Sequence, residues 1–459
     1  MEYKGINIDV KNKPFFEQGY IPTIKFIDGY LKSAKEPFAF AVERNDGYIS
    51  KFDTFICGDN EKHDLDLFYL KLITQIGLRF WGGWKLYLCG NIDLAKQVQM
   101  FYASDPQVSQ LTGFAKSAYD KDFCIEFLDY KDCPENEGSQ PVGNHFDGCR
   151  IGFDGGASDR KVSAVIDGEV IYSEEVLWSA KFNPDIEYHY NEILTAFKTA
   201  ASKLPKVDAI GVSTASLVVD NLLRFTSFFK MVPPEIAAEK GKDIYQRAAS
   251  QIGDNIPIVI ANDGAVSALA GSMLLKKNKL LGIAVGTSVG MGYVDGAGNL
   301  TKYTASIYAT KLALHDDAAL DEPETSTGVG DSYFSQNNVV RLGKQIGIEM
   351  PEELYPAEKL LIIQDLMEKD DPKVQKIYEH IGAVLAHTLP LCALFFDMEN
   401  VYLCGRIFSN KGGDLIVSEC NRILAEEYPD VSKKTTVWLL DENARRVSQS
   451  VAAASLPKL

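Results

Sequence analysis

Short apolar runs alternate with helical patterns along the chain, and this alternation predicts an α/β fold. In the most informative stretch, residues 258–261 and 280–285 are typical of buried strands. The small residues of segment 265–275 between them predict a helix thin enough to lie close to a sheet. Asn262 and Asp263 follow the first strand, and a glycine-spaced turn, GTSVGMG, follows the second. Ligands bind at the carboxyl ends of strands in open α/β sheets. We therefore expect a carboxylate beside an anion-binding turn, which suits phosphoryl transfer to an alcohol.

The pattern divides the chain into three regions. Residues 1–147 begin with an alternating β-hairpin and end in a polar segment, rich in Gly and Pro, that is typical of a linker. In residues 148–260 a strand, a glycine turn, a hairpin, a helix and another strand follow in that order. A looser version of the same order recurs in residues 261–459. Two such units facing each other would form a two-lobed nucleotide-binding fold, preceded by an extra N-terminal α/β region.

Length and composition limit the classes of function. With 459 residues the chain is too long for one ordinary core, and two or three domains are expected. A formal net charge of -16 argues against a nucleic-acid partner, because nucleic-acid phosphates attract basic surfaces. The start of the sequence does not resemble a signal peptide, and no apolar run reaches membrane-spanning length. We therefore expect a cytoplasmic protein with no membrane partner. The eight cysteines form no CxxC pair, so reduced thiols are expected.

Three glycine-bearing turns, each just after an apolar strand, are candidates for ligand contact. In the first turn, Asp154 is followed by Gly155, Gly156, Ser158 and Lys161. Mg²⁺ keeps most of its waters and takes few protein carboxylates, so Asp154 is a candidate metal ligand through water. Taken alone, this turn has a plain alternative explanation as the entry to a hairpin.

The other two turns offer backbone groups with little side chain in the way. The second supplies N–H groups and two hydroxyls that suit a phosphate, from Gly286, Thr287, Ser288, Gly290 and Gly292. The third precedes a helix and would let backbone approach a purine ring, at Gly405, Gly412 and Gly413. Their plain alternatives are a strand crossover and a loop with a helix cap.

Together, the three turns with Asp263 between the first two resemble the actin-like ATPase superfamily, in particular the ROK family of repressors and sugar kinases. The family's DxGGT-type first phosphate loop corresponds to DGGASDRK, and its NDANAAALGE-like segment to NDGAVSALAG. Its GTGIGGG-like second loop corresponds to GTSVGMG, and its adenosine-binding strand to VYLCGRIFSNKGGDLIV. The resemblance covers residues 149–459 and implies a two-lobed, ribonuclease H-like fold.

The resemblance implies a role for each motif. Asp263 would be the general base that takes a proton from the attacking sugar hydroxyl, and Asn262 would hydrogen-bond the sugar. Asp154 would position Mg²⁺, the first two turns would hold the phosphates of ATP, and the third would face adenosine. The implied activity is ATP- and Mg²⁺-dependent phosphorylation of a hydroxyl of a small-molecule sugar. The sequence does not determine the oligomeric state, although kinases of this type are often homodimers.

The sequence also departs from the family pattern. The GExGH segment that holds the sugar is missing, and His315 in LALHDD is the remaining candidate, against the alternative of a solvated surface histidine. The CxCGxxGC zinc cluster is missing too, so no structural zinc is expected. Asp159 adds an acid that would repel phosphate unless Arg160 or Lys161 compensates. Arg406 stands where the adenosine turn of the family has a glycine.

Residues 1–147 match no part of the standard kinase and show no basic helix–turn–helix, so a repressor role is not expected. Their order of hairpin, helix and strand faintly resembles an actin-like half without its glycine loop, and a dimerisation or packing domain is the alternative. Two other functions stay open for the whole chain. One is a catalytically silent relative that binds sugar or nucleotide for regulation, and the other is a structural protein that keeps only the fold.

Overall fold

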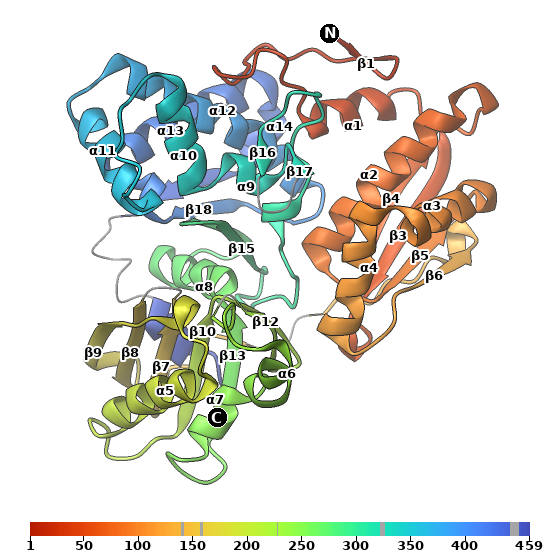
Figure 1. Cartoon of the computed structure of the whole chain (residues 1–459). Helices are drawn as coiled ribbons and strands as arrows, with labels where there is room; N and C mark the ends of the chain where they lie inside the picture. Colours follow the sequence, from red (N-terminus) through yellow and green to blue (C-terminus); the bar gives the residue numbers. More distant parts are fainter. Residues whose placement is uncertain (139–141, 157–158, 227, 322–325, 441–448) are drawn as a thin grey trace. The chain divides into compact units, whose positions relative to one another are not determined.

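The computed structural model describes residues 1–138, 142–156, 159–226, 228–321, 326–440 and 449–459 (Figure 1). The chain forms two compact units, each assembled from segments that are distant in the sequence. The first unit comprises Met1–Gly138, Ile283–Met291 and Tyr303–Leu439, and the second comprises Ser139–Gly282, Gly292–Lys302 and Leu440–Leu459. The predicted boundary after residue 260 falls inside a strand, β13 (Ile258–Asn262), and the second unit continues beyond it.

A five-stranded sheet forms the centre of the second unit, with strand order β13-β10-β7-β8-β9. The other strands are β7 (Cys149–Gly155), β8 (Asp159–Ile166), β9 (Glu169–Leu177) and β10 (Ala209–Thr214). β10 runs parallel to both β7 and β13, whereas β8 is antiparallel to β7 and to β9. The three parallel strands therefore end at one edge of the sheet, where Gly155, Thr214 and Asn262 stand in register.

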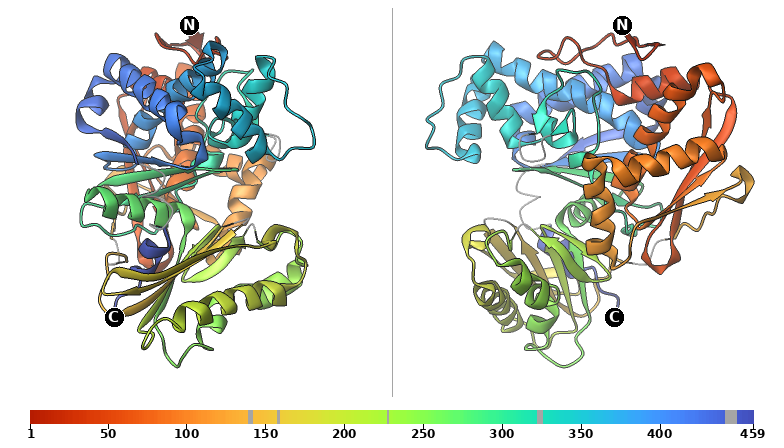
Figure 2. Two further views of the ribbon diagram at one scale, coloured as in Figure 1. Left: turned by 90° about the vertical axis from the view of Figure 1, so that its left-hand side faces the viewer. Right: turned by 45° about the vertical axis from the view of Figure 1, so that its right-hand side comes forward.

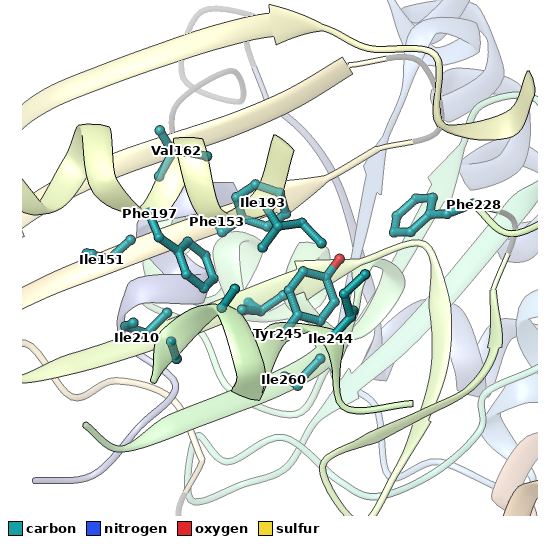
Figure 3. Packing of buried hydrophobic residues seen from close by; sticks show 14 of the residues in the cluster. Ile151, Phe153, Val162, Ile193, Phe197, Ile210, Phe228, Ile244, Tyr245 and Ile260 are labelled. Carbon is teal, nitrogen blue, oxygen red and sulfur yellow. The ribbon is translucent and has the colours of Figure 1, made fainter. Parts of the chain in front are cut away.

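One face of this sheet is apolar and packs against helices α5 (Ile186–Ala201) and α7 (Ile244–Ala249), as Figure 3 shows. Side chains alternate along a strand, so Phe153 of β7 points to this face while its neighbours point away. The Phe153 ring centroid lies 5.6 Å from that of Phe197 and 5.8 Å from that of Tyr245. In Figure 2, α5 (yellow-green) lies along the sheet.

The opposite face of the same strands receives the C-terminal helical residues 449–454. Gly152 of β7 and Gly211 of β10 point to this face. A Cβ at Gly152 would lie 1.8 Å from the carbonyl oxygen of Ser450, and one at Gly211 would lie 1.6 Å from that of Ala453. No side chain fits at either position, because the helical backbone itself lies directly on the sheet.

Polar contacts hold the C-terminal residues against this face. Arg150 of β7 is fully buried, and its guanidinium Nη1 donates to the carbonyl of Pro457 at 2.7 Å. The Nε of the same guanidinium donates to the carbonyl of Asp147 at 2.6 Å. Ser163 Oγ of β8 lies 2.6 Å from Ser450 Oγ. The end of the chain is thus part of the core of the second unit.

Several shorter elements complete the second unit. Helix α8 begins directly after β13 and has the small residues that the sequence predicts for a helix against a sheet. The remaining elements are β11 (Ser216–Val219), β12 (Leu222–Thr226), α6 (Pro234–Ile236) and α8 (Asp263–Leu275).

The first unit contains an N-terminal sheet of four strands in the order β4-β3-β5-β6. The predicted hairpin is present, with β3 and β4 paired from Glu36 and Ile56 to Glu43 and Ile49. β3 is antiparallel to β5 as well, and β5 is parallel to β6. β7 is instead parallel to its neighbour β10, and the likeness of residues 1–147 to an actin-like half stays a prediction. The elements are α1 (Thr23–Leu31), β3 (Glu36–Glu43), β4 (Ile49–Ile56), α2 (His63–Trp81), β5 (Lys85–Cys89), α3 (Ile92–Ser104), α4 (Pro106–Tyr119) and β6 (Cys124–Leu128).

The first unit also contains most of a second four-stranded sheet, of order β15-β14-β18-β19, in which β18 and β19 are parallel. Its strands are β14 (Leu280–Val285), β15 (Val289–Val294), β18 (Asn400–Cys404) and β19 (Thr436–Leu439). Residues 280–282 of β14 and 292–294 of β15 belong to the second unit. The remaining helices of the first unit are α9 (Gly330–Tyr333), α10 (Gln336–Gln345), α11 (Pro356–Glu368), α12 (Pro372–Ala393), α13 (Asn410–Glu427) and α14 (Pro429–Lys434). Within the described ranges, no helix combines the length and apolarity that crossing a membrane requires.

The close contact at Gly211 leads to a stability prediction. Gly211→Ala should lower the free energy of unfolding of the second unit by about 3 kcal/mol, because a Cβ there forces the C-terminal helical residues off the sheet. Chemical denaturation followed by circular dichroism measures the loss. Gly296→Ala is the matched control in the same unit, since its Cβ would make only an ordinary 3.5 Å contact with Lys279. Equal stability of the two variants would contradict the proposed packing constraint.

Candidate active site

The structure brings together two of the predicted site carboxylates, Asp154 and Asp263. Asp154 is the penultimate residue of β7, and Asp263 directly follows β13, with β10 between the two strands (Figure 1). All three strands are parallel, so both carboxylates stand at the same edge of the sheet. The negative charge of Asp154 contributes to the raised pKa of Asp263.

The Asp154 carboxylate is almost completely buried, with 5% of its surface exposed. Ser213 of β10 stands opposite in the register, and its hydroxyl donates to Asp154 Oδ1 at 2.7 Å. Burial raises the pKa of Asp154, while the Lys161 ammonium and the Ser213 hydroxyl oppose this effect. The carboxylate is therefore short of compensating charge, which makes it receptive to a cation.

Asp263 is the first residue of α8 and retains some contact with solvent. Burial is the main cause of a raised pKa at Asp263, and the negative charge of Asp154 is the second. Together they raise this pKa to about 7. The backbone N–H of Gly264 donates to Asp263 Oδ1 at 2.9 Å and partly offsets this rise. The result is a carboxyl group that changes charge near neutral pH.

Asn262 forms the N-cap of α8, and its amide is engaged with the backbone at both ends. Its Oδ1 accepts from the N–H of Gly264 at 2.9 Å, and its Nδ2 donates to the carbonyl of Ser216 at 3.1 Å. These bonds shape the turn that presents Asp263. The contact with a sugar hydroxyl that the sequence predicts for Asn262 stays a prediction.

Two residues that the sequence analysis did not select tie the strand ends together. The Gln449 side-chain N–H₂ group donates to the Asp263 carbonyl and to Ser213 Oγ, each at 3.3 Å. Ser213 in turn donates to Asp154, so one chain of hydrogen bonds connects both carboxylate-bearing segments. Ser213 ends the strand predicted over 209–213 and was open to the same reasoning that selected Asp154 and Asp263. Gln449 lies far away in sequence within a small-residue helix and carries no such signal.

In the described part of the first predicted phosphate loop, the backbone N–H and carbonyl of Gly156 are both hydrogen-bonded to other residues of the protein. The N–H of Gly156 donates to the carbonyl of Asp159, and the Trp178 indole N–H donates to the carbonyl of Gly156, each at 2.9 Å. Gly155 is the last residue of β7 and stands in register with Thr214. Ser158 lies outside the described residues.

The charge of Asp159 is balanced by Lys161 and not by Arg160. Arg160 is buried, and its Nε donates to Glu192 Oε2 at 2.8 Å. Lys161 Nζ lies 3.2 Å from Asp159 Oδ1. Burial lowers the pKa of Lys161, but the carboxylates of Asp154 and Asp159 outweigh it and raise the pKa above its usual value. A charged ammonium therefore stands beside the first loop.

The second predicted phosphate loop joins β14 and β15. Thr287 and Ser288 are exposed, and the nearest atom to a Cβ at Gly286 would be 4.0 Å away, so that part is open. Gly290 is partly exposed. Gly292 is buried instead, and a Cβ there would lie 2.4 Å from Ala265 Cα. Gly292 thus lets β15 pack against the start of α8, whereas the portion that is open to a ligand is 286–290.

A carboxylate that the sequence analysis missed contacts this loop. Ser288 Oγ donates to Asp331 Oδ1 at 2.5 Å, and the N–H of Val289 donates to the same oxygen at 3.0 Å. The N–H of Gly286 is also used, because it donates to the carbonyl of Ser288 at 2.9 Å. At least two of the loop's backbone donors are therefore engaged within the protein.

The glycines of the third turn serve close packing. Gly405 has a φ of +107°, and a Cβ there would lie 2.0 Å from the carbonyl oxygen of Val285. Gly412 and Gly413 are buried in the first turn of α13. A Cβ at Gly412 would lie 2.3 Å from the Tyr378 ring, and one at Gly413 would lie 2.2 Å from a backbone oxygen. Arg406 is exposed beside them.

His315 is buried, with 6% of its surface exposed, so the alternative of a solvated surface histidine is wrong. Its Nε2 lies 3.0 Å from Glu17 Oε2, and the Tyr333 hydroxyl donates to the same carboxylate oxygen at 2.8 Å. The Tyr20 ring stands edge-on to the imidazole at 5.5 Å. His315 therefore belongs to a buried polar cluster of the first unit that includes the N-terminal segment.

The residues at the sheet edge fit a magnesium ion better than a metal held entirely by protein. Across the described ranges, no group of three or more His, Cys, Asp or Glu side chains is arranged to hold a metal. Mg²⁺ commonly uses one or two carboxylates together with water and substrate phosphates. Asp154, whose pKa is raised by burial, provides such a carboxylate.

Comparison with known proteins identifies the fold. No protein-family model matches the sequence, and no curated protein matches it either. Among solved structures, a ROK family glucokinase from Streptomyces griseus, in complex with glucose and AMPPNP, aligns with a TM-score of 0.50 and 19% identity. The alignment covers 67% of this chain and 99% of that one. A Listeria monocytogenes protein proposed to be an N-acetylmannosamine kinase aligns with a TM-score of 0.50 and 15% identity over 67% of this chain and 97% of its own.

A ROK family transcriptional regulator, a homologue of the Escherichia coli MLC protein, aligns with a TM-score of 0.54 and 14% identity. The alignment covers 84% of this chain and 96% of the regulator. At these identities the comparisons establish the fold and leave the activity open. The predicted fold class is confirmed: the chain has the actin-like α/β fold shared by ROK-family sugar kinases and regulators.

Proposed function

We propose that the protein is an ATP- and Mg²⁺-dependent kinase, acting in the cytoplasm on a hydroxyl of a sugar or sugar derivative. The observation that carries this proposal is the position of the Asp263 carboxyl group, which directly follows a parallel strand at the sheet edge that also bears Asp154. Burial and the charge of Asp154 raise the pKa of Asp263 to about 7. A general base is most effective when its pKa lies near the working pH. A carboxylate with the usual pKa would be a much weaker base.

The mechanism assigns a role to each side chain at the sheet edge. Asp263 accepts the proton of the attacking sugar hydroxyl, and its partial exposure leaves room for that hydroxyl. Gln449 and Ser213 hold the two carboxylate-bearing segments in place. Asp154, together with water, would hold Mg²⁺, which supplies positive charge for the phosphates. Lys161 keeps the charge of Asp159 from repelling the nucleotide.

The glycine turns would bind the nucleotide. The open part of the second loop, with Gly286, Thr287 and Ser288, is proposed to hold phosphate oxygens. For Gly155 and Gly156 of the first loop, the predicted phosphate contact stays a prediction. The third turn would approach adenosine with backbone, because Gly405 holds it close to β14. The glucokinase of the same fold, solved with glucose and AMPPNP, supports the choice of a sugar and a nucleotide as ligands.

A catalytically silent, sugar- or nucleotide-binding regulator is the second candidate. Asp331 engages two donors of the second loop, which favours weak nucleotide binding. A transcriptional regulator among the proteins of the same fold is consistent with this alternative. Retention of Asp263 with a pKa near neutrality favours the kinase.

Turnover tests the kinase directly. With Mg²⁺-ATP, at least one member of a panel of hexoses, amino sugars, acyl-amino sugars and sugar acids should stimulate ADP release. Asp263→Asn should reduce that rate by about 100-fold or more and leave nucleotide affinity largely unchanged, because it removes only the proton acceptor. Coupled ADP detection and isothermal titration measure the two effects.

Asp254→Asn is the matched control, since Asp254 is an exposed carboxylate of the same unit. It should keep full activity. Full activity in Asp263→Asn would remove Asp263 as the base. Nucleotide binding without turnover across the panel would favour the silent regulator, and absence of both would leave only a shared fold.

The raised pKa of Asp263 predicts two pH effects. The value of kcat/KM should fall about tenfold per pH unit below pH 7, because only the ionised carboxylate accepts a proton. Folding favours the protonated carboxyl, so its contribution to stability is lost as pH rises from about 4 to about 7. Asp263→Asn should therefore unfold at a higher temperature than the parent at pH 8, with a smaller difference at pH 5. The same difference in melting temperature between Asp263→Asn and the parent at pH 8 and at pH 5 would contradict the raised pKa of Asp263.

A further inference from the structure

The loop between β14 and β15 already holds an anion, the side chain of Asp331. This residue lies in α9, 43 residues beyond Ser288. One oxygen, Oδ1, accepts both the Ser288 hydroxyl at 2.5 Å and the Val289 backbone N–H at 3.0 Å. Two donors on one charged oxygen make a stronger contact than two separate neutral hydrogen bonds.

The same donor types bind phosphate oxygens. A hydroxyl and a backbone N–H in a glycine-bordered turn after a strand form the kind of concave site that receives phosphate. Gly286 leaves one side of the turn open, since no atom would lie closer than 4.0 Å to a Cβ there. The Asp331 oxygen therefore takes up donors that a phosphate oxygen would use.

We propose that Asp331 is an internal occupant of the phosphate-binding turn, and that nucleotide binds there only by displacing or sharing its carboxylate. This inference rests on the proposed function for the identity of the incoming anion. ADP and ATP carry several negative charges, so a fixed carboxylate opposes them both by repulsion and by holding the donors. Asp331 thus limits the affinity for nucleotide and keeps the turn ordered when no nucleotide is bound.

The alternative is that Asp331 only shapes the turn, and two substitutions separate the cases. Asp331→Asn keeps a carbonyl oxygen that accepts from Ser288 and Val289 and removes the charge. Asp331→Ala removes the acceptor as well. If the charge is the obstacle, the Asn variant gains affinity. If shape alone matters, the Asn variant behaves like the parent and the Ala variant loses affinity.

The experiment is isothermal titration of ADP, with and without Mg²⁺, into the full chain and its variants. Asp331→Asn should bind ADP about tenfold more tightly than the parent at low ionic strength, with a smaller gain at high salt. Asp430→Asn is the matched control, because Asp430 is a fully exposed carboxylate of the same unit. It should leave the affinity unchanged. Melting curves confirm that each variant is folded.

A second variant connects the gain to this turn. Ser288→Ala in the Asp331→Asn background should reverse most of the gain in ADP affinity. It deletes the hydroxyl that a phosphate oxygen would contact once the charge at position 331 is removed. Unchanged or weaker ADP binding by Asp331→Asn would overturn the inference, as would a gain of equal size in Asp430→Asn.

The outcomes for this inference and for the kinase are distinguishable. Tighter ADP binding by Asp331→Asn without phosphorylation of any sugar would support the internal occupant and reject the kinase. Sugar phosphorylation with unchanged ADP affinity in the variant would support the kinase and reject the occupant. Absence of ADP binding in every variant would reject both.

Discussion

The contact between the C-terminal helical residues and the five-stranded sheet is the constraint on which the second unit depends. At Gly152 and Gly211 the helical backbone lies where side chains would stand, and Arg150 holds the chain end through backbone carbonyls. The same face carries Asp154 and Ser213 two residues further along their strands, because side chains alternate along a strand. Packing of the last residues therefore determines the surroundings of the site. Gln449, at the start of these helical residues, reaches the Asp263 carbonyl and Ser213.

Electrostatics at the sheet edge follows from this packing. The parallel strands β7 and β13, with β10 between them, place Asp154 and Asp263 at the same edge of the sheet, where Asp154 is buried. Burial raises the pKa of both groups, the charge of Asp154 adds to the rise at Asp263, and the hydrogen bonds from Ser213 and Gly264 limit the two rises. An exposed pair of carboxylates would keep ordinary pKa values and would be poor bases near neutral pH. The chemistry proposed for Asp263 thus depends on the core as much as on the residue itself.

The sequence predicted the strands that position the site because their apolar runs are short, continuous and bounded by glycine or polar residues. Asp154 and Asp263 were identifiable because each ends such a strand. Spacing alone could not distinguish a glycine that faces ligand from one that packs against protein. Gly292, Gly412 and Gly413 illustrate this, since their Cβ positions are filled by a helix, a tyrosine ring and a backbone oxygen. Asp331 and Gln449 were also missed, because each reaches the site from a segment distant in sequence.

The two carboxylates beside predicted ligand loops, Asp154 and Asp331, differ in one physical respect. Asp154 accepts a single side-chain hydroxyl and faces a charged lysine in its own unit, so part of its charge is compensated and a cation can complete the balance. Asp331 takes a hydroxyl and a backbone N–H on one oxygen, a donor set that suits an anion. A carboxylate of the first kind is suited to a metal ion such as Mg²⁺, whereas one of the second kind occupies donors that suit a phosphate. The donors that hold Asp331 are therefore the ones that a nucleotide phosphate would need, and this applies to a kinase as much as to a nucleotide sensor.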